Sequence, residues 1–201
     1  MCCLAAFFLF AMAASPQAPA QTCHVDVAAR STALRAYALH PSGDTARAAR
    51  RVLEEPPCVS TPPVHRVPED EQDAAFMAVL QPLRRQLAAG DDESWKLAFA
   101  LAVIADGGDL EDLYAVIGGA VSRQPRMFLE RAIARPGLGS ISVVSFLGAD
   151  YSDQPVSRCR ELQERLAAIV AVEDPHLVAA RDEALSVLRA EGKTEGCRTR
   201  G

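Results

Sequence analysis

The sequence predicts an all-α protein, a bundle of antiparallel helical hairpins held by two disulfides. Apolar residues recur at spacings of three and four along most of the chain, which is the period of an amphipathic helix. Proline and glycine separate these segments, so the helices should be about 10 to 15 residues long. Only residues 140–147 have the β-branched composition of a strand, and no second segment offers them a convincing partner.

Two helices are expected in the first part of the chain. Asp26 can cap the first helix, and Pro41 ends it because proline cannot continue a helix. The second helix opens at Asp44 or Thr45 and closes at Pro56. We expect its arginines to form a solvated face. The less favoured alternative is that they bind an anionic ligand.

A proline-rich connector should follow. Residues 56–68 contain five prolines, which forbid a helix and favour an extended backbone on the surface. The acidic run 69–73 then suits the positive end of a helix, and it lacks the ligand spacing of a calcium loop. Pro82 should kink this helix or begin a new one, which Gly90 ends.

Residues 94–121 are the most apolar stretch beyond the first twenty residues. We expect them to form a buried hairpin around which the rest of the chain packs. Acidic residues 91–93 should cap its first helix, and Asp109 should cap the second after the glycine turn 107–108. Five side chains of the first helix should be almost fully buried: Trp95, Phe99, Leu101, Val103 and Ile104.

Gly118 and Gly119 lie inside the second helix of this hairpin, where each costs about 1 kcal/mol relative to alanine. Two explanations are favoured: a bare patch that lets a neighbouring helix approach, or an early end of the helix. A backbone exposed to a ligand is the less favoured alternative, because no polar residue nearby would complete a binding site.

Three further helices are expected after the hairpin. Pro125 starts the first, residues 156–172 form the second, and Asp174 starts the last, which Gly192 stops. Residues 140–147 should form a short buried helix, with a strand as the alternative.

The domain organisation follows from these elements. One helical domain should span residues 21–192, with the connector 56–68 inside it and a carboxy-terminal tail at 193–201. Residues 92–98 and 109–115 share a loose pattern of an acidic cap followed by an aromatic residue. One loose similarity between two segments does not establish a repeat. HEAT-type stacking and a compact irregular bundle are therefore both compatible with the sequence.

Residues 1–20 should be a secretory signal peptide, because about a dozen apolar residues precede small residues that suit cleavage after Ala20. This run is too short to span a bilayer, which needs about 20 residues. Cleavage near Ala13 or Ala14 is the alternative, and lipid modification of Cys23 is disfavoured. Arginine, alanine and proline are abundant and lysine is rare, which suggests a GC-rich bacterial genome. A periplasmic or secreted location is therefore expected.

Four cysteines follow the leader, and an oxidising compartment favours their pairing. Cys23 precedes the first helix and Cys58 follows the second, so antiparallel packing should bring them together. Cys159 lies near the start of the penultimate helix and Cys197 lies beyond the end of the last. The predicted disulfides are thus Cys23–Cys58 and Cys159–Cys197. A zinc site is the rival reading, and it would need cysteines about two to four residues apart.

No residue pattern in the sequence predicts a catalytic, cofactor-binding or metal-binding site. The four histidines lie in separate segments, so none pairs with another on a helix face. The formal charge of −5 disfavours binding to nucleic acid, and no basic segment would anchor the processed chain to a membrane.

The favoured function is a non-enzymatic module that binds a protein partner, because helical hairpins present broad surfaces. A periplasmic inhibitor or immunity-type protein fits the small size, acidity and disulfides by analogy. The alternative is a hydrolase or lyase whose site assembles from distant helices, and such a site would be a polar pocket with perturbed pKa values.

Overall fold

The computed structural model of the chain describes residues 24–55, 58–59, 67–134, 141–148 and 151–197. Its α-helices are α1 (Val27–Leu39), α2 (Gly43–Glu54), α3 (Glu69–Ala89), α4 (Asp92–Ile104), α5 (Gly107–Ala120), α6 (Pro125–Ala134), α7 (Pro155–Val170) and α8 (Val178–Thr194). The 3-10 helices η1 (Ser142–Ser145) and η3 (Pro175–Leu177) and the short strands β1 (His24–Val25) and β2 (Cys58–Val59) complete the fold. The prediction of an all-α protein is confirmed.

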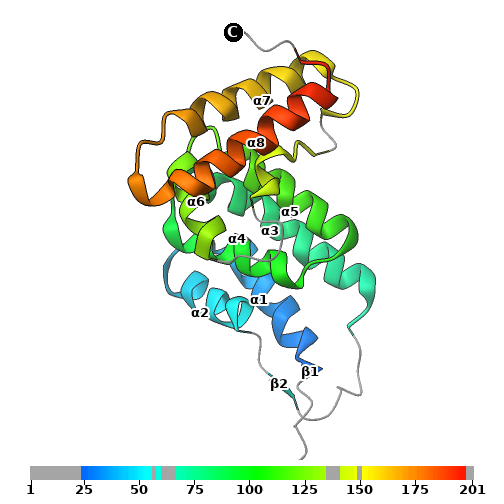
Figure 1. Cartoon of the computed structure of the whole chain (residues 1–201). Helices are drawn as coiled ribbons and strands as arrows, with labels where there is room; N and C mark the ends of the chain where they lie inside the picture. The colour runs from blue at the N-terminus through cyan, green and yellow to red at the C-terminus, as the bar shows by residue number, and fades with distance from the viewer. Residues whose placement is uncertain (1–23, 56–57, 60–66, 135–140, 149–150, 198–201) are drawn as a thin grey trace, which may run out of the picture.

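Figure 1 shows α1 and α2 at one end of the molecule, α7 and α8 at the opposite end, and α3, α4 and α5 between them. α1 packs along α2 and α3, and α7 packs along α8. α5 makes its largest contact with α3, whereas α4 is shared among α2, α3, α5 and α6. The central pair of helices is present, but its two members pack mainly on other neighbours, and stacking of the HEAT type is not shown.

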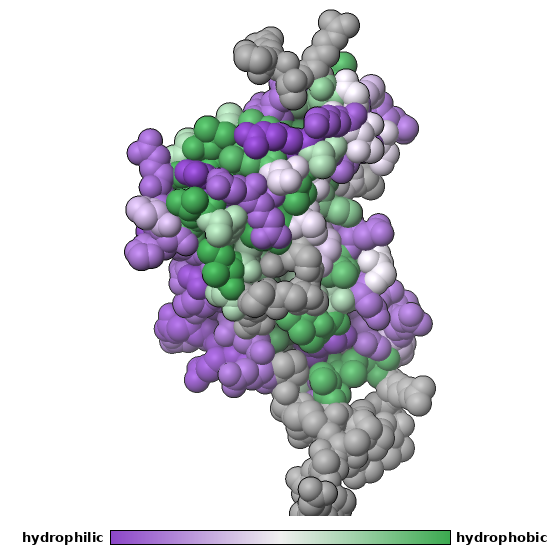
Figure 2. Space-filling model, in the orientation of Figure 1, coloured by the Kyte–Doolittle hydropathy of each residue, from purple (hydrophilic) through white to green (hydrophobic). Residues whose placement is uncertain are grey.

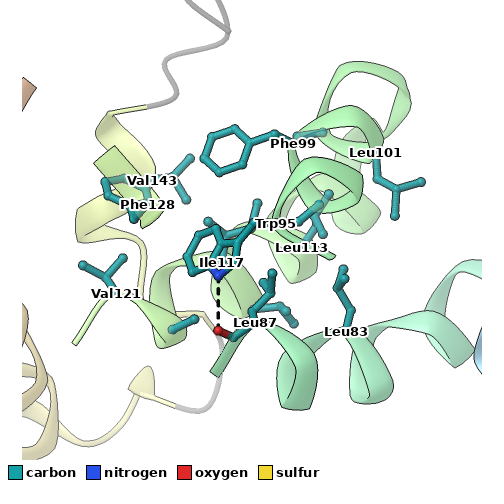
Figure 3. Close-up of a cluster of buried hydrophobic side chains, with 14 of the residues drawn as sticks. Leu83, Leu87, Trp95, Phe99, Leu101, Leu113, Ile117, Val121, Phe128 and Val143 are labelled. Carbon is teal, nitrogen blue, oxygen red and sulfur yellow. Dashed lines mark hydrogen bonds between the residues drawn. The ribbon is translucent and has the colours of Figure 1, made fainter. Parts of the chain in front are cut away.

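Trp95 of α4 lies in the centre of the core (Figure 3). It is fully buried, and its indole N–H donates to the carbonyl of Leu87 at 3.2 Å, which satisfies its one polar atom. The rings of Phe99 and Phe128 have centroids 6.4 and 6.5 Å from that of Trp95. This cluster joins α4 to α3 and α6 and confirms that α4 is a core helix.

The burial of α4 does not reach its last turn. Leu101 is fully buried as predicted, but Val103 is 52% exposed and Ile104 is half-buried. Val103 continues the face of Phe99 by one helical turn, and the side chains that cover Phe99 do not extend over that turn. The prediction of near-complete burial was therefore wrong for Val103 and Ile104.

A buried hydrogen bond connects α1 to α4. The hydroxyl oxygens of Tyr37 and Ser94 lie 2.8 Å apart, and both side chains are buried. Burial raises the pKa of the Tyr37 phenol above its ordinary value, with the Ser94 hydrogen bond acting in the opposite direction. The pair satisfies two polar groups that would otherwise be costly inside the core.

Side-chain caps begin two helices as predicted. Asp26 accepts from the N–H of Ala29 at 3.0 Å, and Asp91 accepts from the N–H of Ser94 at 2.8 Å. α5 begins at Gly107, two residues before the predicted cap at Asp109. The turn is shorter than expected because Gly107 adopts a φ of +48°, a conformation that glycine accepts without strain.

Pro82 does not divide α3, which runs unbroken from Glu69 to Ala89. Proline lacks the N–H that would bond to the carbonyl of Ala78. The helix continues because its apolar face is buried on both sides of the proline, with Val79 and Leu83 fully inaccessible to solvent. The predicted end at Gly90 is confirmed, and this glycine has a left-handed φ of +80°.

The carboxy-terminal elements also depart slightly from the prediction. The segment 140–147 contains the 3-10 helix η1, with Val143 and Val144 buried. The prediction of a short buried helix, rather than the alternative of a strand, is confirmed. α8 continues through Gly192 to Thr194. The glycine that ends it is Gly196, which has a φ of +68°.

The disulfide Cys159–Cys197 is present, with Cα atoms 5.3 Å apart, and it closes the α7–α8 hairpin as predicted. The second predicted bridge involves Cys23, which lies outside the described residues. β1 and β2 pair in antiparallel register, with His24 opposite Val59 and Val25 opposite Cys58. The segment before α1 and the segment after α2 therefore pair with each other, at the place where the Cys23–Cys58 disulfide was predicted.

Candidate functional site

A groove of about 550 Å³ lies between α5 and α7 and reaches the end of α3. One face of α7 lines it, with residues at helical spacings of three and four: Ser157, Arg160, Glu161 and Glu164. α5 contributes only the small residues Ala115, Gly119 and Ala120. Arg84 of α3 and Arg123 of the turn after α5 add further charged side chains to the lining.

The two interior glycines of α5 have different surroundings. A Cβ atom on Gly118 would lie 2.6 Å from the carbonyl oxygen of Phe146 and 2.7 Å from a guanidinium nitrogen of Arg165. Gly119 has no atom within 4 Å of the same position and lines the groove. Close approach at Gly118 is thus confirmed, and the groups that approach it are backbone carbonyls of the η1 segment and the side chain of Arg165 on α7.

Arg165 is a buried hub at the base of this groove, with 1% of its surface exposed. Its Nη1 donates to the carbonyls of Val144 and Phe146 at 2.9 and 2.8 Å. Its Nε donates to Glu161 at 2.9 Å. Burial lowers the pKa of the Arg165 guanidinium, and the Glu161 carboxylate acts in the opposite direction. Arg165 therefore fixes the position of η1 against α7.

Arg165 is not among the residues predicted from the sequence. A signal existed, because this residue lies three positions after Leu162 and four before Ile169, on the apolar stripe of α7. A charged residue at such a position is buried only when it has partners. Its partners are mainly backbone carbonyls, and no pattern in the sequence identifies those.

Three arginines of the groove hold no carboxylate within the described part of the chain: Arg84, Arg123 and Arg160. All three side chains are exposed. With Arg165, the described residues that line the groove include four arginines and two glutamates, a formal charge of +2 in a chain of charge −5. The groove is therefore a local positive region on an acidic protein.

The amino-terminal end of α7 opens into this region. Gln154 is the N-cap of α7, and both it and Ser157 of the first turn line the groove. The first N–H groups of a helix carry a partial positive charge of about half an elementary unit. The orientation of α7 therefore adds to the potential of the arginines.

A second pocket of about 420 Å³ adjoins the groove, and Leu147 lines both. The charged residues in the described part of its lining are Glu111, Asp112, Arg158 and Glu191. Arg158 forms an ion pair with Glu195. The second pocket is thus acidic, in contrast to the positive groove beside it.

Neither depression brings together the parts of a nucleophilic or metal site among the described residues that line it. The described parts of the two linings contain serines but neither histidine nor cysteine. Across the described ranges, no three His, Cys, Asp or Glu residues converge in a geometry that could hold a metal ion. What the positive groove supplies is charge and hydrogen-bond donors.

The predicted site residues are the four cysteines. Cys159 and Cys197 are brought together, Cys58 lies on β2, and Cys23 lies outside the described residues. His40 and His176 are exposed, and they lie in separate places, His40 just after α1 and His176 in η3. No helix in the described part of the chain combines the length and apolarity that crossing a bilayer requires. Comparison of the chain with protein-family models, curated proteins and solved structures gives no match.

Proposed function

We propose that this chain is an exported, non-enzymatic binding protein that holds a protein partner in the groove between α5 and α7. The observation that carries the proposal is the set of exposed arginines there, which no carboxylate of the described residues neutralises. Guanidinium groups left without a partner are available to bind another molecule. A role as a periplasmic inhibitor or immunity-type protein is the form of binding that the small, acidic chain suits by analogy.

Export is part of the proposal. The apolar leader 1–20 would direct the chain across the membrane. The disulfide between Cys159 and Cys197 supports this, because such bonds persist mainly in oxidising compartments.

The alternative of a hydrolase or lyase receives less support from the same groove. Such an enzyme needs a group that transfers a proton near the reacting atoms. The carboxylates along the described lining are Glu161, which Arg165 holds, and Glu164, which is exposed. These two carboxylates therefore support a role in binding more than a role in proton transfer.

The test is affinity capture from a periplasmic extract with the mature chain, combined with a variant that fills the groove. Gly119→Leu places a side chain in open space, so the fold should be retained. The matched control is Gly108→Leu in the first turn of α5, where a new side chain also meets no neighbour. We expect the captured partner to be lost with Gly119→Leu and kept with Gly108→Leu. Equal capture by both variants would exclude this groove as the binding site.

A further inference from the structure

We propose that the groove recognises an acidic polypeptide segment, whose carboxylates bind Arg84, Arg123 and Arg160. This inference rests on the proposed function and names the chemistry of the partner. The three guanidinium groups come from three different parts of the fold: α3, the turn after α5, and α7. Charges spread over three elements fit several separate anionic groups better than a single one.

The size of the groove agrees with an extended ligand. Its volume of about 550 Å³ is far larger than one carboxylate or phosphate group needs and falls within the range of about 300–1,000 Å³ that is typical of ligand sites. Ala115 and Gly119 present little side chain on the α5 wall, so a polypeptide backbone can approach this helix closely.

The lining also favours a polypeptide over a continuous polyanion. Glu164 and Glu161 lie on the same face of α7 as Arg160, and they would repel a chain that carries a phosphate on every unit. A peptide can turn backbone N–H groups toward Glu164 and its carboxylates toward the arginines. The hydroxyls of Ser122 and Ser157 can bond to its backbone.

The surrounding charge adds selectivity. Because the whole chain has a formal charge of −5, its net field repels a strongly anionic partner, and a local positive region offsets that repulsion where the partner binds. Arginine binds a carboxylate through two parallel hydrogen bonds, which fixes the orientation of the bound segment as well as its position. The groove should therefore select for the arrangement of acidic residues and not only for their number.

The experiment measures fluorescence anisotropy of labelled peptides with the full mature chain. The acidic probe is a ten-residue peptide of alternating glycine and glutamate, and the neutral probe replaces each glutamate by glutamine. We expect the acidic probe to bind, the neutral probe to bind at least tenfold more weakly, and the affinity to fall as salt is raised.

Charge-reversal variants locate the binding. Arg84→Glu, Arg123→Glu and Arg160→Glu should each weaken binding of the acidic probe about tenfold. The matched control is Arg85→Glu, because Arg85 is exposed on the same helix as Arg84 but does not line the groove. This control changes the net charge equally, so we expect its affinity to stay within about twofold of that of the parent chain.

Three outcomes would overturn the inference: equal binding of the two probes, equal weakening by Arg85→Glu, or tighter binding of tripolyphosphate or single-stranded DNA than of the acidic peptide. The results also separate this inference from the proposed function. Capture abolished by Gly119→Leu but unchanged by the arginine variants would keep the groove as the partner site and reject the acidic segment. Arginine-dependent peptide binding with capture unaffected by Gly119→Leu would reject the partner site alone.

Discussion

Gly118 and Gly119 are consecutive in α5, yet only the first is needed for packing. Gly118 lets the carbonyl of Phe146 and the guanidinium of Arg165 reach the helix backbone, whereas Gly119 lies beside open space. A helix that contains both glycines carries a cost in backbone entropy twice. Close packing offsets this cost at Gly118 but not at Gly119.

Substitution by alanine should therefore have opposite effects at these two sites. Gly118→Ala should destabilise the fold by roughly 1–3 kcal/mol, because its Cβ would overlap a backbone oxygen that cannot move freely. Gly119→Ala should stabilise it by up to about 1 kcal/mol through helix propensity. Urea denaturation followed by the fluorescence of Trp95, the one tryptophan of the chain, measures both. Effects of equal sign would contradict the packing assigned to Gly118.

Arg165 gives a second prediction at the scale of the residue. Arg165→Met removes the donor to Val144 and Phe146 and leaves Glu161 without its partner, so we expect a loss of about 3–5 kcal/mol in unfolding free energy. Arg160→Met, five residues earlier on α7 and exposed, is the control and should change stability by less than about 0.5 kcal/mol. Similar losses for both variants would show that Arg165 has no special structural role.

At the scale of the element, α4 has a buried turn that carries Phe99, followed by an exposed turn that carries Val103. Phe99→Ala should cost about 3–5 kcal/mol because it opens a cavity beside Trp95 and Phe128. Val103→Ala lies one turn further on the same face and should change stability by less than about 0.5 kcal/mol. Thermal unfolding of the two variants compares them directly, and a cost at Val103 near that at Phe99 would mean that α4 is covered to its end.

The helices were largely predictable from the sequence, because local signals determine where a helix begins and ends. Asp26 and Asp91 cap their helices as expected, and Gly90 ends α3. Periodicity shows which face of a helix is apolar, but not how far a neighbour covers it, and Val103 was misjudged for that reason. Of the two outcomes predicted at Pro82, a new helix was wrong, because burial of the apolar face of α3 outweighs the loss of one local hydrogen bond.

The groove could not be predicted, since its lining comes from α3, α5 and α7. No motif in the sequence connects Arg84 with Arg160, which lie on helices far apart in the chain. Only the packing of distant helices brings them around one depression with Arg123. The α7–α8 disulfide was predictable, in contrast, because the two helices that it joins are consecutive and a helix of known length has a known span.

The Cys159–Cys197 bond should contribute about 4 kcal/mol to stability by restricting the unfolded chain, given its sequence separation of 38. A double variant with serine at both positions should lose this amount in urea denaturation. The unmodified chain under reducing conditions provides the comparison and should match the variant to the extent that no other disulfide contributes. No loss in the variant would show that native packing alone holds the α7–α8 hairpin.

For the whole molecule, we predict a second covalent clamp at the amino-terminal end, between Cys23 and Cys58. The register of β1 and β2 supports it, because Val25 pairs with Cys58. Peptide mapping of the exported protein without reduction should give one linked pair at each end and a chain that begins near Gln21. A link from Cys23 to Cys159 or Cys197, or free thiols, would contradict this arrangement.

The Cys159–Cys197 bond also affects the order in which the molecule can assemble. Contacts across 38 residues are slow to form in a free chain, because a long loop must close before they stabilise anything. In the oxidised chain that loop is already closed, so the contacts at the open end of the α7–α8 hairpin, which lie furthest apart in the sequence, become effectively local. Refolding should then start at this hairpin, and the segment of η1 should join it through Arg165. The helices of the amino-terminal half would add to a surface that already exists.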